Sequence, residues 1–294
     1  LVTCSGPAPK RKEALKEPGV IEEAAIASFQ GRIVYVGSDR ELEKKIKPVA
    51  GATILEADGL VGLPGLIDPH THLPFAGTRE QEFVLRLKGA TYQELAARGL
   101  GIQTTVKATR EISRDKLVDL CLERLNTMLL HGTTMVEAKS GYGLDFETEI
   151  KQLEALQKVS EIHPVEIIPT YLGAHEVPPE FRNNKAGYLQ LLIEKVMPEI
   201  RRRNLAEFID VFCEEGVYSI EEAIILARAA KKLGFRIRLH ADEFSSLGGA
   251  ELAVELGAAS ADHLINITER GIAALAGSST VAILLPMVPL FLRL

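Results

Sequence analysis

The chain has 294 residues, 46% of them hydrophobic and 25% charged, which is typical of a globular protein with a large buried core. A formal net charge of −6 argues against a nucleic-acid surface, which needs clustered Lys and Arg, and favours a small-molecule partner. The well-separated cysteines Cys4, Cys121 and Cys213 argue against a disulfide framework and a thiolate zinc site, so we expect a reducing, cytoplasmic compartment.

Residues 1–60 are predicted to form a small β module. Two β-prone runs, Ala24–Phe29 and Arg32–Gly37, flank Gln30-Gly31, which has the composition of a hairpin turn.

Residues 61–294 are predicted to form a (β/α)8 TIM-type barrel that lacks its last strand. Short apolar strands alternate with helical patterns, which is typical of βα units around a parallel sheet. The pattern supplies seven strands where a complete barrel has eight. They are expected near 63–70, 133–138, 165–171, 207–213, 235–241, 259–263 and 279–285. Helices are expected near 113–130, 146–161, 188–203, 219–233, 247–256 and 268–276.

Helix ends are marked by capping residues. Ser113 and Ser219 are predicted N-caps, and Glu222 completes a capping box with Ser219. Gly132, Gly234 and Gly257 follow predicted helices, as expected of C-terminal glycine stops.

The last apolar stretch, Val281–Leu292, contains Pro286 and Pro289. It is too short and too broken to span a bilayer, so we predict a buried strand followed by a turn and no membrane partner.

Histidines gather at one predicted face of the barrel. In parallel barrels the active site lies at the C-terminal ends of the strands, where polar residues need a functional or pairing partner. Five of the seven histidines fall there: His70, His72, His175, His240 and His263. The His-x-His spacing of the first two puts both rings on one side of a strand, where they suit zinc or ferrous iron. Two hydrogen-bonded strand-end histidines would give the same pattern.

His240 ends a predicted strand, as expected of a third metal ligand, although a histidine hydrogen-bonded in the barrel mouth fits too. Glu243 follows three residues later, where a carboxylate can take a proton from water and pass it to a leaving nitrogen. A helix-start glutamate is the alternative. His263 closes the next strand, and the residues alone leave open whether it binds metal or polarises a substrate carbonyl.

Several sequence runs are similar to known families. Pro64-Gly65-Leu66-Ile67-Asp68 before His70 and His72 resembles the first-strand signature of the amidohydrolase superfamily. Longer runs resemble the imidazolonepropionase family, in the right order over nearly the whole chain. They are Phe75-Ala76-Gly77-Thr78-Arg79-Glu80, Arg86-Leu87-Lys88-Gly89-Ala90-Thr91-Tyr92, Glu137-Ala138-Lys139-Ser140-Gly141-Tyr142-Gly143-Leu144, Leu172-Gly173-Ala174-His175-Glu176, His240-Ala241-Asp242-Glu243-Phe244 and Ala261-Asp262-His263.

This resemblance implies hydrolysis of the cyclic amide of 4-imidazolone-5-propanoate to N-formimino-L-glutamate, a step of histidine degradation. It implies one divalent metal, zinc or iron, bound by His70, His72 and His240. It also implies substrate contacts from Arg79, Tyr142 and His175, and catalytic roles for Glu243 and His263.

The chemistry of the implied substrate agrees with these roles. An arginine can grip the propionate carboxylate, and a tyrosine hydroxyl and an imidazole can orient the polar ring. Glu243 is expected to shuttle the proton while the metal and His263 stabilise the developing oxyanion. Without the family, Arg79 would be interpreted as a solvated surface charge, Tyr142 as a loop-packing residue and His175 as a backbone-bonded loop residue.

The sequence departs from the family near its last residues. Family members carry a further metal-binding aspartate at the end of strand eight, whereas this sequence reaches Leu294 soon after Leu284-Leu285-Pro286. We therefore hypothesise an incomplete form of the protein. A soluble and active sample with an intact mass of 32.1 kDa would contradict that hypothesis.

Two other functions stay open. Another amidohydrolase, such as a ring deaminase, would be favoured if Arg79→Ala left activity intact. A catalytically inactive fragment would be favoured by less than stoichiometric zinc or iron. The choice between zinc and iron and the oligomeric state, with a homodimer as one outcome, are also open.

Overall fold

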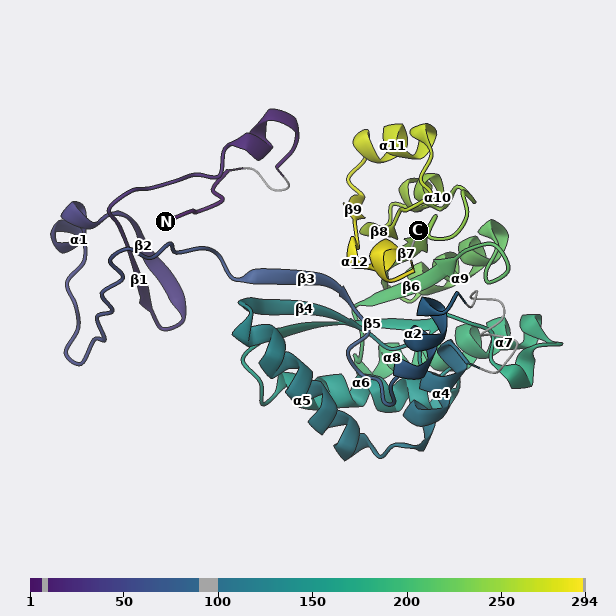
Figure 1. Ribbon diagram of the computed structural model, residues 1–294. Helices are drawn as coiled ribbons and strands as arrows, with labels where there is room; N and C mark the ends of the chain where they lie inside the picture. The colour runs from purple at the N-terminus through teal and green to yellow at the C-terminus, as the bar shows by residue number, and fades with distance from the viewer. Residues whose placement is uncertain (7–9, 90–99, 293–294) are drawn as a thin grey trace. The chain divides into compact units, whose positions relative to one another are not determined.

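The computed structural model describes residues 1–6, 10–89 and 100–292 (Figure 1). The chain divides into two compact units, Leu1–Leu66 and Ile67–Leu294. Residues 90–92 of one family-like run lie outside the described residues.

The first unit contains the predicted β-hairpin. The elements of this first unit are η1 (Lys12–Lys16), β1 (Ala24–Phe29), β2 (Arg32–Ser38) and α1 (Asp39–Lys45). The two strands pair antiparallel around Gln30 and Gly31, whose φ angles are 50° and 75°. Positive φ at both positions is the signature of a two-residue type I′ turn, which matches the twist of the flanking strands. The predicted hairpin turn is confirmed.

The second unit contains a sheet of seven strands that are neighbours in chain order. They are β3 (Leu66–Thr71), β4 (Thr133–Lys139), β5 (Glu166–Ala174), β6 (Phe208–Cys213), β7 (Arg236–Ala241), β8 (Ser260–His263) and β9 (Val281–Ile283). The registered pairs from β4 to β9 are all parallel. The predicted seven-stranded barrel architecture is therefore confirmed, and parallel order brings the C-terminal strand ends to one face.

Helices connect these strands, as expected of βα units (Figure 1). They are α2 (Glu80–Leu87), α4 (Ile102–Glu111), α5 (Arg114–Leu130), α6 (Phe146–Ser160), η2 (Pro179–Phe181), α7 (Lys185–Leu191), the π-helical η3 (Leu192–Val196), α8 (Met197–Arg203), α9 (Ile220–Lys232), α10 (Gly249–Glu255), α11 (Glu269–Ala276) and α12 (Met287–Leu292). The single helix predicted near 188–203 is thus a continuous series of three segments.

The predicted helix caps are present. The Ser113 hydroxyl accepts a hydrogen bond from the Lys116 amide, and Ser219 forms a reciprocal capping box with Glu222. The glycines after α5, α9 and α10 have φ angles of 91°, 83° and 55°, the left-handed conformation of a C-terminal stop.

The sequence pattern did not indicate α2 or α4. In α4, Thr105 and Thr109 are buried four residues apart, so the face that packs inward looks polar in the sequence. Both hydroxyls are used: Thr109 accepts from the Ala76 amide, and Thr105 accepts from Arg79. The β-branched threonines also lower helix propensity.

The stretch 281–292 differs from its prediction. A strand is present at β9, but it is not the buried strand that was predicted, because Val281 and Ala282 are exposed and only Ile283 is buried. Met287–Leu292 is a short helix rather than a turn. Pro289 lies in the first turn of α12, where a missing N–H is tolerated. Among the described residues, no helix is long and apolar enough to cross a membrane.

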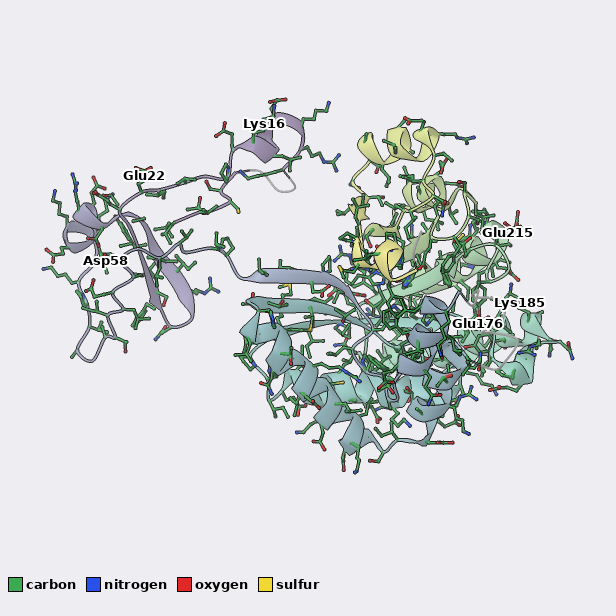
Figure 2. The ribbon with its side chains drawn as sticks, viewed as in Figure 1. Lys16, Glu22, Asp58, Glu176, Lys185 and Glu215 are labelled. Atoms are coloured by element: carbon green, nitrogen blue, oxygen red, sulfur yellow. The ribbon has the colours of Figure 1, made fainter. Side chains whose placement is uncertain are left out.

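Polar and charged groups are distributed unevenly over the chain. Charged side chains such as Lys16, Asp58 and Glu215 are exposed (Figure 2). The interior of the second unit is largely apolar, with Leu117, Leu153 and other side chains fully buried. Buried charged residues occur within β4, β6, β7 and β8, and these strands lead to the candidate site.

Candidate functional site

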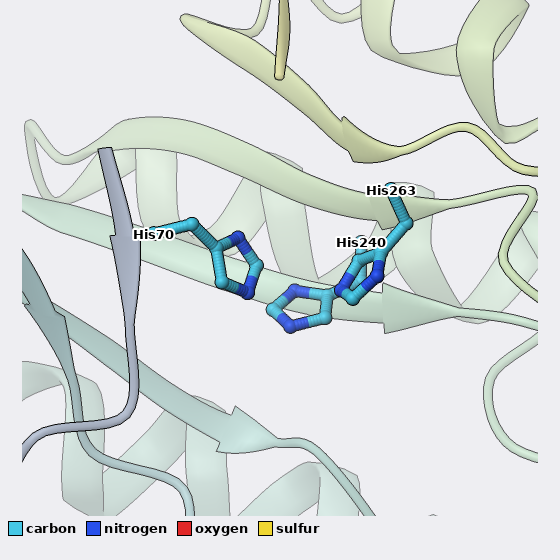
Figure 3. Close-up of side chains that lie close together, drawn as sticks. All are labelled: His70, His240 and His263. Carbon is cyan, nitrogen blue, oxygen red and sulfur yellow. The ribbon is translucent and has the colours of Figure 1, made fainter. Parts of the chain in front are cut away.

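Three imidazole rings meet at the ends of β3, β7 and β8 (Figure 3). His70, His240 and His263 are buried, and one ligand nitrogen of each lies within 4.8 Å of the others. Their ring centroids are 4.6 to 5.0 Å apart. Strands distant in the sequence thus bring three potential metal ligands together.

His72 and His175 lie beside this trio. The His72 ring is stacked on His175 at 4.9 Å, and it is 5.4 Å from the His70 ring and 5.5 Å from the His240 ring. All five histidines predicted at the barrel face therefore converge. The tightest trio contains His263, whereas the resemblance implied His72 as the third ligand with His70 and His240.

The ring nitrogens fit a divalent metal. Among the described residues, His72 Nδ1 and both ring nitrogens of His240 and of His263 are buried without a hydrogen-bond partner. Burial lowers the pKa of His70 and His72 well below the ordinary value, and that of His175 and His263 to about 3. The rings are therefore neutral near pH 7, the form that donates a lone pair to zinc or iron.

Arg79 and Tyr142 form a polar pair next to the histidines. The Arg79 guanidinium donates to the Thr105 hydroxyl at 2.9 Å and to the Tyr142 hydroxyl at 3.2 Å. The Tyr142 ring lies 5.5 Å from His72 and 5.2 Å from His175. A hollow of about 400 Å³ adjoins the pair, lined by Phe75, Gly77, Thr78, Arg79, Glu80, Thr105, Arg124 and Tyr142. Arg124 donates to the Leu73 and Phe75 carbonyls, so Arg79 is the guanidinium at this hollow that suits an anionic ligand.

Two glycines fix the position of Tyr142. Gly141 has a φ of 110°, and a Cβ there would lie 2.8 Å from the Leu172 carbonyl oxygen. A Cβ on Gly143 would lie 2.6 Å from the Glu149 amide. The backbone around Tyr142 therefore requires glycine on both sides.

Glu243 is placed to exchange protons. Its carboxylate is buried and lies 3.5 Å from Nδ1 of His263. Burial, with a further contribution from the Glu214 carboxylate, raises the pKa of Glu243 to about 7 despite the opposing effect of His240. A carboxyl group that titrates near neutral pH is suited to act as both base and acid.

The backbone around Glu243 and His263 adopts uncommon conformations. Asp242, His263 and Leu264 have φ angles of 51°, 78° and 59° without being glycine. Surrounding bonds hold this geometry: the Asp242 carboxylate accepts from three backbone amides at the start of α10, and the Leu264 amide donates to the Ala241 carbonyl. Such conformations cost free energy and are concentrated at functional sites.

The sequence-based predictions assigned no role to five buried charged residues beneath the histidines. They are Glu137, Lys139, Asp210, Arg238 and Asp262, and we call them the buried charge cluster. The sequence did contain a signal for this cluster. Charged residues alternate with apolar residues in β4 and β7, and side chains two positions apart share one face of a strand, so these charges are expected on the same face.

Known proteins were compared with the whole chain. No protein-family model matches it. Imidazolonepropionase of Symbiobacterium thermophilum is 49% identical over 287 residues, which is 97% of this chain and 67% of the relative. Imidazolonepropionase of Geobacillus kaustophilus is 48% identical over 99% of this chain and 70% of the relative.

The chain belongs to the imidazolonepropionase family. The family resemblance stated from the motifs is thereby confirmed. Solved structures agree with the fold of this imidazolonepropionase-family chain. A 5-methylcytosine deaminase from Klebsiella pneumoniae has a TM-score of 0.63 at 15% identity, covering 88% of this chain and 62% of the deaminase. A guanine deaminase from C. acetobutylicum has a TM-score of 0.58 at 16% identity, covering 93% and 65%. At these identities the likeness supports the barrel fold alone.

Proposed function

We propose that this chain hydrolyses the ring amide of 4-imidazolone-5-propanoate and releases N-formimino-L-glutamate. The family relationship supports the reaction. The observation that carries the choice of substrate is the Arg79–Tyr142 pair beside the histidines. The guanidinium would bind the propionate carboxylate, and the tyrosine hydroxyl and His175 would orient the ring.

The proposed ligands of one divalent ion are His70, His72 and His240. The His70 and His240 rings are 4.6 Å apart, and the His72 ring lies 5.4 and 5.5 Å from them. The family resemblance, rather than the tightest trio, supports His72 over His263 as the third ligand. Zinc or iron, when bound there, would supply Lewis-acid activation of water near neutral pH.

Glu243 would move the proton during hydrolysis. Its carboxylate takes a proton from the water whose oxygen forms a bond to the ring carbonyl carbon. When the ring C–N bond breaks, Glu243 returns the proton to the departing nitrogen. The pKa of about 7 makes both transfers feasible near neutral pH.

His263 would stabilise the charge that develops on the carbonyl oxygen. Burial lowers its pKa to about 3, so the ring is neutral and still has one N–H to donate. A neutral donor placed at the oxygen stabilises the tetrahedral intermediate without giving up its proton.

The proposal is tested by turnover of imidazolone propionate, followed by mass spectrometry of the product. We expect formimino-glutamate from the wild type and a much higher KM for Arg79→Ala, since the carboxylate loses its partner. Glu80→Gln is the control: it removes a negative charge at the same hollow, so KM for the anionic substrate should not rise.

Two results would favour the alternative functions. Release of ammonia from a nucleobase, unaffected by Arg79→Ala, would favour a ring deaminase. A chain that lacks both turnover and stoichiometric zinc or iron would favour an inactive form.

We further propose that the protein acts on a small molecule in the cytoplasm. Unpaired cysteines, two of them buried, support a cytoplasmic place of action. The net negative charge supports a small molecule rather than a nucleic acid as partner. A homodimer is tested by light scattering of the purified protein.

A further inference from the structure

The buried charge cluster has one lysine at its centre. Lys139 is fully buried, and its Nζ donates to Glu137 at 2.9 Å and to Asp210 at 2.8 Å. The same nitrogen lies 3.7 Å from Asp262 Oδ2, which also accepts from Arg238 at 3.2 Å. Arg238 in turn donates to the Pro69 carbonyl at 2.7 Å, next to His70 in the chain.

Two carboxylates of this cluster also face histidines of the site. Asp262 Oδ2 is 2.6 Å from Nδ1 of His70. Asp210 Oδ1 accepts from the His240 backbone amide at 3.1 Å, and its Oδ2 lies 2.9 Å from His240 Nδ1, although these two are not aligned for a regular hydrogen bond. A carboxylate at Nδ1 makes that nitrogen the protonated one, which leaves Nε2 free to bind a metal.

The charges of the cluster do not cancel. By formal charge, three carboxylates and two cations, all buried, leave one net negative charge beside the imidazoles. Burying charge is costly unless it is compensated, and a divalent cation at the histidines would compensate it. The cluster is therefore suited to hold metal ligands rather than merely to fill the barrel.

We propose that Lys139 is a positioning residue of the metal site, an inference that rests on the metal-dependent function proposed above. Lys139 binds the Asp210 carboxylate and lies close to that of Asp262, and so holds both acids against His240 and His70. Each acid fixes one ring with Nδ1 protonated and Nε2 directed to the ion. Lys139 touches neither substrate nor metal in this arrangement.

The test is metal affinity. Apo-protein prepared with a chelator is titrated with Zn²⁺ in competition with a chromophoric chelator, and with Co²⁺ while its visible absorption is recorded. Asp262→Asn keeps the shape of the side chain but presents an amide that can donate to Nδ1, which favours the wrong tautomer. Lys139→Met replaces the central cation with an uncharged side chain of similar length.

We expect the wild type to bind one Zn²⁺ per chain. Both variants should bind Zn²⁺ about 10–100-fold more weakly, the usual effect of losing such a partner, and their Co²⁺ absorption bands should change. Unchanged Zn²⁺ affinity in either Asp262→Asn or Lys139→Met would overturn the inference, even if that variant melted earlier. If Lys139→Met does not fold, Asp262→Asn alone decides in the same way.

The matched control is Lys151→Met. Lys151 makes three hydrogen bonds, each 2.9 Å long, to the carbonyls of Thr109, Arg110 and Ile112 at the end of α4. This variant should melt earlier with unchanged Zn²⁺ affinity. A wild type that binds no Zn²⁺ would instead contradict the proposed function itself, so the two failures are distinguishable.

Discussion

The buried charge cluster and the two loops that carry Tyr142 and Glu243 are stabilised in different ways. In the cluster, carboxylates contact side chains: Asp262 contacts the ring of His70, and Lys139 contacts Asp210. The two site loops, residues 140–145 and 242–248, are instead held by carboxylates that bind backbone amides.

Glu149 and Glu214 are the acids that hold these loops. Glu149 is fully buried and accepts from the amides of Gly141, Gly143 and Leu144 at 2.9 to 3.0 Å. Glu214 accepts from the Glu243 amide at 3.1 Å and from the next amide at 2.9 Å. A carboxylate can accept several such bonds at once, which fixes a loop without any regular secondary structure.

This difference separates two tasks. Side-chain contacts orient the proposed ligand rings, so changes in the cluster should alter metal affinity. Backbone contacts orient the loops, so changes there should alter substrate binding and proton transfer while metal affinity stays constant.

The largest expected effect is that of Glu243→Gln. The amide cannot accept and return a proton, so kcat should fall by about 10²–10⁴-fold. Zn²⁺ affinity should stay at the wild-type value, because Glu243 belongs to a loop and not to the cluster. Steady-state rates and metal titration check both parts, with the exposed Glu255→Gln as control. Wild-type turnover in Glu243→Gln would contradict its catalytic role.

A smaller effect is expected for Glu149→Gln. The amide loses the charge that binds three backbone N–H groups, which should cost about 1–3 kcal/mol of unfolding free energy. The loop then holds Tyr142 less precisely, so KM should rise more than kcat falls. Glu147→Gln, an exposed change on the same helix α6, is the control. Weaker Zn²⁺ binding in Glu149→Gln would contradict the prediction that the loops affect substrate binding and the buried charge cluster affects metal affinity.

The pH profile of kcat/KM offers a finer test. Glu243 must be ionised to accept a proton, and its pKa is raised to about 7, so kcat/KM should fall as pH drops below about 7. Glu214→Gln removes a neighbouring negative charge that contributes to this rise. The acid limb should therefore move to lower pH. A limb that stays in place, or moves to higher pH, would contradict this influence of Glu214.

The smallest effect is expected far from both regions. Ser219→Ala removes the N-cap of α9 and should lower the unfolding free energy by about 1 kcal/mol. Denaturant unfolding measures the loss. Neither KM nor Zn²⁺ affinity should change, and a change in either would mean that stability alone affects the site.

Much of the fold was predictable because its signals are local. The period of apolar residues identified all seven strands, and Ser219 with Glu222 identified a helix start, since each depends on neighbours in the chain. The helix α4 was missed because its buried face carries Thr105 and Thr109, whose hydroxyls bond to a distant loop. No local pattern distinguishes such a face from a solvated one.

The candidate site was partly predictable for the same reason. Strand ends in a parallel barrel share one face, so the positions of His70, His240 and His263 in the sequence were enough to bring them together. The motifs indicated the family, which the relatives then showed.

The sequence by itself thus determined the order of strands, the caps and the face on which the histidines gather. Only the tertiary structure decided which groups meet behind those histidines. Lys139 and Asp210 are 71 residues apart, and His70 and Asp262 are 192 apart, yet each pair is in contact. These contacts arise because the sheet curls into a nearly closed barrel that excludes water, and buried charges then need partners on other strands.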